Sequence, residues 1–267
     1  MIDLKREACG LPFFIYINLD MELLKSHRTV RKYKTREIRD DVLNDILECG
    51  IRASNTGNMQ LYSIIVTKSI GKKAELAPLH FNQPMVKKAP LLLTICFDVN
   101  RFKLWCAVND ANVDFSGLLW LLNGTIDSSI LAQNICVAAE SYGLGICYLG
   151  TTLYNAPEIS KILHLPEGVI PITTLTIGYP EVVPDLTDRL SLDSVVHFEE
   201  YQNYSAEEIS EMYDYKEKLE SSQKFIAENG KDNLAQVYTD VRYKSTDSLF
   251  FSQKLLTMLK DQGFVFD

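Results

Sequence analysis

The 267-residue sequence contains no apolar run long enough to cross a bilayer, since a transmembrane helix needs about 20 consecutive apolar residues. The nearest candidate, Leu11–Leu19, is short, contains Pro12 and lacks the small-residue cleavage site of a signal peptide. Internal repeats and proline- or serine-rich linkers are also absent. We therefore expect no membrane association, one domain over residues 21–267, and an extension of unknown role at residues 1–20.

Cysteine pairs with metal-binding or redox spacing are missing as well. The six cysteines form no CxxC pair and no cluster with histidines, which are the usual marks of a zinc site or a redox centre. Most of them lie inside apolar stretches, which is typical of buried free thiols in a reducing compartment. We expect a cytoplasmic protein with no disulfide and no bound metal.

An excess of positive charge is the third absence. The chain has 27 Lys and Arg against 35 Asp and Glu, for a net charge of −8. Nucleic acids and anionic membranes require a basic face on their partner, so this balance argues against both. A local basic pocket for a phosphorylated ligand remains compatible with it.

Helical and strand patterns are interleaved through the first two thirds of the chain, which indicates an α/β or mixed α+β layer fold. From about residue 184 the sequence turns polar and reads as an extension. The predicted helices cover residues 40–53, 125–142, 155–163 (with Asn155 as its cap), 205–220 and 248–262, and the predicted strands cover 61–67, 91–97, 146–150 and 170–179.

A basic segment, Ser26–Tyr33, is the strongest local signal for ligand binding. It carries His27, Arg28, Thr29 and Arg31. These donors can converge on one anion, because a guanidinium group grips phosphate in a fork and a hydroxyl adds a neutral donor. Taken alone, the solvated basic end of a helix is the simpler interpretation.

A second polar segment, Arg52–Ser63, follows the helix predicted over 40–53 and precedes a strand. Ser54, Asn55, Asn58 and Gln60 place hydroxyl and amide groups around Gly57. By itself, ordinary turn chemistry explains such a loop.

Together, the two segments resemble the nitroreductase family, which has a basic R-[ST]-x-R element, a helix, and a small polar loop ending in Asn-x-Gln before a strand. Three later stretches extend the resemblance in the same order: Asp127–Gly145, Tyr148–Gly150, and Gly178–Pro180 with Leu186–Leu190. An ordered set of segments is more specific than a single motif. The polar C-terminal third is similar to the extension of the larger, NADPH-dependent branch.

The resemblance implies a nitroreductase-like, three-layer α+β fold with a central, mixed but mostly antiparallel sheet flanked by helices. It implies a homodimer in which the C-terminal extension wraps the partner subunit. It also implies FMN sites at the subunit interface, where the opposite subunit supplies Ser54, Asn55, Asn58 and Gln60.

The remaining FMN contacts implied by the resemblance lie in four places. His27, Arg28 and Thr29 would approach the phosphate and the ribityl chain, and Arg31 the N1–C2 edge of the ring. The other expected contacts are Gln83 on the ribityl or pyrimidine side, the backbone of Tyr148, Leu149 and Gly150 near N5, and Arg189 at the phosphate. The sequence departs from the family at Thr187, where lysine is usual, and at Thr151, where a second glycine is usual.

Hydride chemistry in such a protein belongs to the flavin, so we expect no catalytic side chain beyond tuning by Arg31. We expect ping-pong transfer of hydride from NAD(P)H, with NADPH favoured over NADH, to a small acceptor such as a nitroaromatic, a quinone or a flavin. Lys231, in the loop 229–233, is the candidate for the NADPH 2′-phosphate, with a solvated polar loop as the equal alternative. The alternative function is a flavin-binding or flavin-storage protein without turnover.

Overall fold

The computed structural model describes residues 21–112 and 114–266, so the extension expected at residues 1–20 lies outside the described residues. The described residues divide into two compact units, one formed by those up to 186 together with 253–266, and one formed by residues 187–252. The expectation of one domain over residues 21–267 stays a prediction.

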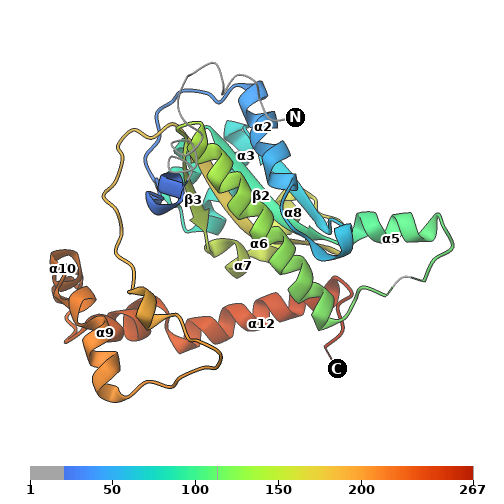
Figure 1. Cartoon of the computed structure of the whole chain (residues 1–267). Coiled ribbons are helices and arrows are strands. Elements are labelled where there is room, and N and C mark those ends of the chain that lie inside the picture. Colours follow the sequence, from blue (N-terminus) through green and yellow to red (C-terminus); the bar gives the residue numbers. More distant parts are fainter. Residues whose placement is uncertain (1–20, 113, 267) are drawn as a thin grey trace. The chain divides into compact units, whose positions relative to one another are not determined.

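The described part of the first unit contains one four-stranded sheet in the order β1-β2-β4-β3, with all neighbouring strands antiparallel (Figure 1). An isolated parallel bridge joins Thr29 to Ile146 of β3, so the sheet region is mixed but mostly antiparallel, as predicted. Every residue of β2 is buried, which fits its continuous apolar sequence and a strand covered on both faces. The strands are β1 (Tyr62–Thr67), β2 (Leu91–Asp98), β3 (Gly145–Leu149) and β4 (Val169–Gly178).

Helices cover both faces of this sheet and complete three layers. On one face α2 (Asp40–Ile51) and α6 (Leu118–Ser141) lie side by side (Figure 1), and Leu93 and Ile95 of β2 pack in a core cluster with them. Leu92, which points the other way, packs in a second cluster formed largely by the helices of the opposite face. Those helices are α3 (Ile70–Leu76), α4 (Pro84–Lys88), the turn η3 (Ala77–His80) and α8 (Ala156–Leu163). The α+β prediction is therefore confirmed.

Helix α6 begins at Leu118, seven residues before the predicted start at Thr125. The extra turns have the sequence Leu-Leu-Trp-Leu-Leu, which is apolar on every side and therefore shows no helical period. Gly117, with extended backbone at φ −76° and ψ 158°, precedes the first turn. The prediction of the start was wrong because an apolar run by itself does not distinguish helix from strand.

The expected cap of α8 is also corrected. Asn155 precedes the helix, but its side chain makes no capping hydrogen bond. Instead its Nδ2 donates to the Leu79 carbonyl at 2.7 Å, and its Oδ1 accepts from Lys254 Nζ at 2.9 Å. A tertiary role has replaced the local one, and the fixed φ of Pro157 in the first turn still favours the helix start.

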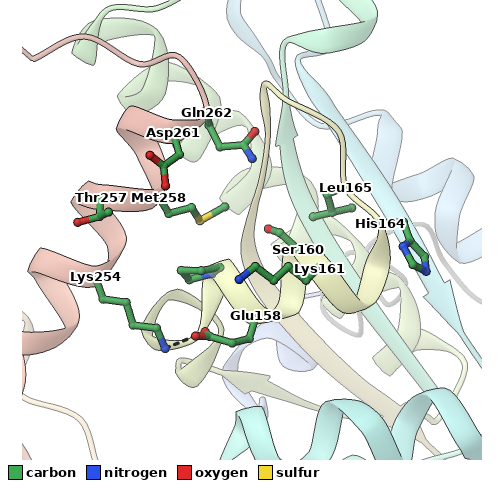
Figure 2. Close-up of a pocket in the computed structure, with 11 residues that line it drawn as sticks. Glu158, Ser160, Lys161, His164, Leu165, Lys254, Thr257, Met258, Asp261 and Gln262 are labelled. Carbon is green, nitrogen blue, oxygen red and sulfur yellow. Dashed lines mark ion pairs between the residues drawn. The ribbon is translucent and has the colours of Figure 1, made fainter.

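Residues 253–266 belong to the first unit and pack in its core. Helix α12 (Ser245–Asp261) contributes Met258 and Leu259 to a cluster around Phe97 and Phe264. Figure 2 shows Lys254 reaching from α12 to Glu158 of α8, with 2.7 Å between the charged atoms. The remaining elements of this unit are α5 (Asn100–Ala107), α7 (Thr151–Tyr154) and the turn η2 (Thr56–Asn58).

The second unit is helical where it is regular. Ser205 caps α9 by accepting from the Glu208 amide while the Glu208 carboxylate accepts from the Ser205 amide, which is a capping box. The helix expected over 205–220 ends at Lys218, and Leu219, at φ −57° and ψ 137°, separates it from α10, which was not predicted. The elements are η4 (Leu192–Ser194), α9 (Ala206–Lys218), α10 (Glu220–Glu228), α11 (Leu234–Val237) and the π-helical turn η5 (Tyr238–Arg242).

Two smaller expectations can be compared with the described residues. All five described cysteines are free, and four of them are buried, but Cys49 is exposed. No helix in the described part of the chain has the length and hydropathy to cross a membrane.

Candidate functional site

The basic segment lies against the sheet edge formed by β3. Thr29 forms a bridge with Ile146, and the Val30 amide donates to the Ile146 carbonyl at 2.8 Å. The same strand ends at Leu149, within the turn Tyr148–Gly150. The structure therefore brings the donors His27–Arg31 and the expected flavin-contacting turn to one edge of the sheet.

His27 is held by a carboxylate from α6. Its Nδ1 lies 2.6 Å from Glu140 Oε1, and the two side chains are 28% and 11% exposed. A carboxylate at Nδ1 fixes the orientation of an imidazole and leaves Nε2 for another partner. Sequence reasoning missed Glu140, because 113 residues separate it from His27.

Cys136 completes a group of three possible metal ligands with His27 and Glu140, whose ligand atoms lie within 4.8 Å of one another. Burial strongly raises the pKa of the Cys136 thiol, which disfavours the thiolate that binds metals. The carboxylate also occupies His27 Nδ1. We therefore interpret the group as a hydrogen-bonded histidine and carboxylate beside a buried thiol.

Arg28 supplies the best test of whether the segment fits an anion. Its Nη1 donates to the Ser26 carbonyl at 2.8 Å, but its Nε is buried and has no hydrogen-bond partner among the described residues. A buried donor without a partner costs roughly 1–3 kcal/mol. A phosphate oxygen is a suitable acceptor for it, so the donor set fits the phosphate of FMN.

Arg31 is exposed and lies beside the Cys147 thiol of β3. Burial raises the pKa of this thiol, and the Arg31 guanidinium offsets part of the rise. The thiol is thus neutral near pH 7, and the Arg31 charge remains available to a ligand at the β3 edge.

The turn after β3 is braced by His80, a residue that sequence reasoning did not select. His80 is fully buried, and its Nδ1 lies 2.8 Å from Thr151 Oγ1. Gln83 is attached to the same turn of chain, because its amide donates to the His80 carbonyl at 3.1 Å. Thr151, where the family usually has a second glycine, therefore has His80 as its partner. The role of Gln83 on the ribityl or pyrimidine side of FMN stays a prediction.

His80 should make stability depend on pH. Burial lowers its pKa to about 4, whereas an unfolded histidine titrates near pH 6.5. Below pH 6.5 the unfolded chain takes up a proton that the folded chain refuses, so stability is lost as pH falls from 6.5 toward 4. Between pH 7.5 and 5 the loss should be about 2 kcal/mol.

Urea unfolding of the wild type and His80→Gln across this range, with FMN in constant excess, measures the effect. The variant should show a shallower fall in the free energy of unfolding between pH 7.5 and 5. His164→Asn, at an exposed histidine in the left-handed region (φ 53°), should retain the wild-type slope. Parallel profiles for the wild type and His80→Gln would contradict the assignment.

The second polar loop lies elsewhere along α6. The Thr56 amide donates to both Asp127 carboxylate oxygens at 3.0 Å, and the Gln60 amide donates to Asn55 Oδ1 at 3.2 Å. Asp127 and Glu140 are 13 residues apart on one helix, or about 20 Å. Ser54, Asn55, Asn58 and Gln60 are therefore not brought together with His27 within one chain.

Arg189 and Lys231 belong to the second unit and are described only within it. Arg189 is exposed, and its Nη1 donates to the Asp188 carbonyl at 2.8 Å. Lys231 Nζ lies 2.9 Å from Asp240 Oδ2, and the hydrogen bond from Lys231 lowers the pKa of Asp240. Lys231 already has an anionic partner, and its role with NADPH stays a prediction, as does that of Arg189.

A cleft between α8 and α12 is a different place in the first unit. It has a volume of about 680 Å³ and contains none of the residues predicted to bind flavin. Figure 2 shows charges of both signs facing it, including Lys161, Lys254 and Asp261. The cleft is thus separate from the β3 edge.

The comparison with known proteins decides the family. The model of the family described as "Nitroreductase family" matches residues 24–117 and 122–179, more than half of the chain. The chain belongs to the nitroreductase family. The resemblance read from the sequence is confirmed.

Individual nitroreductase relatives cover most of the chain. It is 34% identical over 194 residues to an NADPH-flavin oxidoreductase of Vibrio harveyi, covering 72% of this chain and 79% of that protein. A crystal structure of a putative oxidoreductase from Bacteroides fragilis is 49% identical, with a TM-score of 0.90 over 92% of this chain and all of that one. The NADPH:FMN oxidoreductase of Vibrio harveyi complexed with NAD⁺ is 28% identical, with a TM-score of 0.75 over 92% and 98%.

Proposed function

We propose that this nitroreductase-family protein is an FMN-dependent oxidoreductase that passes hydride from NADPH or NADH to a small acceptor. The observation that carries the proposal lies at the edge of β3, where Arg28 offers a buried Nε that has no hydrogen-bond partner among the described residues. Family relatives named NADPH-flavin oxidoreductase and NADPH:FMN oxidoreductase support the same cofactor pair.

The residues of the β3 edge have separable tasks in this activity. FMN, when bound, supplies the hydride chemistry. Arg28, Thr29 and His27 bind the phosphate and ribityl chain, and Glu140 orients His27. Arg31 presents an exposed cation that stabilises negative charge on the pyrimidine edge, and the Tyr148–Gly150 turn, braced through Thr151 by His80, offers backbone groups to the ring.

The active species we propose is a homodimer. Helix α6 buries Leu131 and Ile135 in the core, yet it exposes a second apolar face on the other side. A helix that is hydrophobic all round is normally buried all round, and this face needs a cover. It consists of Leu118, Leu119, Leu122, Ile126 and Ile130, between 38% and 68% exposed.

The dimer also explains the position of the loop at residues 54–60. Since about 20 Å of helix separates it from His27 in one chain, a second copy packed along α6 can supply it to the site across the interface. One flavin would then need both chains.

Placing charges on the exposed face of α6 should separate the subunits. Leu122→Asp with Ile126→Asp is expected to give a monomer in light-scattering chromatography and to weaken FMN binding at least 10-fold, because each site loses its partner loop. Ile70→Asp, at a side chain that is 82% exposed on α3, is the matched control and should leave both quantities unchanged. A variant that stays dimeric, or a monomer that binds FMN normally, would contradict the proposal.

Turnover is tested against the alternative of a flavin-storage protein. The purified protein should carry visible flavin absorbance, NADPH should bleach it anaerobically, and menadione or nitrofurazone should restore it. Parallel initial-rate lines on varying both substrates would establish the ping-pong order. If neither NADPH nor NADH bleaches the bound flavin, the protein is a flavin-binding module and the proposed enzyme activity is wrong.

Two finer assignments complete the proposal. The preference for NADPH follows the names of the relatives, and the ratio of kcat/KM for NADPH and NADH measures it. A cytoplasmic location is supported by the buried free thiols Cys96, Cys106, Cys136 and Cys147.

A further inference from the structure

A second concave site in the first unit is rich in lysine. It lies between the segment Tyr33–Ile38, α3, α4 and the start of β2, and has a volume of about 810 Å³. Ligand sites commonly measure 300–1,000 Å³. None of the residues predicted to bind FMN lines it.

The charge of this site is opposite to that of the chain. Its described lining contains two carboxylates, Glu37 and Glu181, against five ammonium groups, from Lys34, Lys68, Lys73, Lys87 and Lys88. In a chain of net charge −8, this concentration of positive charge repels itself unless an anion is present.

Only one of the five lysines is neutralised by a described carboxylate. Lys68 Nζ lies 2.5 Å from Asp40 Oδ1, outside the lining. Among the described residues, no carboxylate lies within 4.0 Å of the ammonium groups of Lys34, Lys73, Lys87 and Lys88.

Lys73 distinguishes the site from a patch of surface lysines. It is 5% exposed, and its Nζ donates to the Ala89 carbonyl at 2.7 Å. An ammonium group has three donors, and buried lysines are almost always paired with an anion. Burial lowers the pKa of Lys73, and its hydrogen-bond partner among the described residues is a neutral carbonyl.

The lining also includes an apolar part. Tyr33, Ile38 and Leu91 are buried side chains of the lining, and Pro90 lies beside them. A ligand that fits both parts carries clustered negative charge and an apolar or planar group.

We propose that this lysine pocket binds an organic diphosphate of the nucleoside diphosphate class, at a site distinct from the flavin. Lysines bind phosphate as point charges, so several of them can surround a diphosphate without a fixed geometry. Lys73 anchors it from inside, and Lys34, Lys87 and Lys88 hold it from the exposed side.

Calorimetric titration of the FMN-loaded protein at low salt tests the proposal, with ADP as the probe and adenosine as the uncharged control. ADP should bind saturably, and adenosine at least 10-fold more weakly. Lys87→Ala with Lys88→Ala, at two exposed positions, should weaken ADP binding at least 10-fold. Lys103→Ala with Lys260→Ala removes the same charge outside the pocket and should leave it unchanged.

A second variant tests the contribution of the buried Lys73 ammonium group. Lys73→Met keeps the length of the side chain and removes its charge, so it should abolish the rise in Tm that ADP gives the wild type. Absence of saturable ADP binding, a full Tm rise in Lys73→Met, or equal weakening by both double variants would overturn the proposal.

The proposed flavin function and the proposed diphosphate site can be refuted independently of each other. FMN content and NADPH oxidation, measured in the same samples, report on the proposed function and do not require the lysine pocket. ADP that competes with NADPH and is insensitive to the lysine variants would place the probe at the flavin and overturn the new site.

Discussion

Arg28→Ala is expected to weaken FMN binding on the order of 100-fold and to leave the fold intact. The variant removes a forked guanidinium from the phosphate, and hydrogen bonds to charged groups contribute about 1.5–3 kcal/mol each. Roughly 3 kcal/mol corresponds to a factor of about 100 in Kd. In the free protein the truncation also removes a buried donor that has no partner in the described part of the chain, so unfolding should not become easier.

Fluorescence titration of the apoprotein with FMN measures the effect. Arg28→Lys keeps a charge but loses the fork, and its Kd should lie between those of the wild type and the alanine variant. Arg39→Ala is the matched control, since Arg39 is exposed and pairs with Asp41 at 2.8 Å. Activity of Arg28→Ala should return at saturating FMN, and an unchanged Kd would remove Arg28 from the site.

Gly124→Ala should be the most destabilising of the small substitutions in the core, at about 3 kcal/mol. Gly124 lies on α6, and a Cβ at this position would overlap the ring of Phe97. Phe97 is fully buried in the middle layer and also packs on Phe264, with 5.9 Å between ring centroids. The ring cannot move away without disturbing the contact between the sheet and the C-terminal segment.

Alanine has a higher helical propensity than glycine, so propensity alone would make Gly124→Ala stabilising. A loss of stability would therefore report the overlap with Phe97. Gly71→Ala, at an exposed position of α3 with only Ser69 Oγ near the new Cβ at 3.7 Å, should stabilise the protein by up to about 1 kcal/mol. Combining Gly124→Ala with Phe97→Leu should recover part of the loss, because the smaller side chain leaves room. Urea unfolding that shows Gly124→Ala as stable as the wild type would contradict the close packing.

The regular elements of the core could be predicted wherever the apolar pattern was unambiguous. Strand β2 was expected over 91–97 and is found at Leu91–Asp98, and α2 was expected from Asp40 and begins there. The apolar pattern of each element matches a single environment. Strand β2 is buried on both faces, and α2 is buried along one stripe. The start of α6 was missed because Leu118–Leu122 is apolar on every side and therefore shows no helical period.

The sequence alone determined which donor side chains the site offers. His27, Arg28, Thr29 and Arg31 are close in the chain, so their convergence needs only one short segment, and the order of later motifs identified the family. Tertiary structure decided what those donors touch. Glu140 is 113 residues from its partner His27, and His80 is 71 residues from its partner Thr151.

Tertiary structure also decided which predicted residues do not meet within one chain. The sequence placed the loop at residues 54–60 among the flavin contacts, and the length of α6 places it about 20 Å from His27. The lysine pocket also depends on tertiary structure. Lys34, Lys73 and Lys88 are spread over 55 residues of sequence and come together only when the chain folds. Neighbouring residues determine which chemical groups a short segment offers, whereas the packing of the helices and the sheet sets the distances between segments.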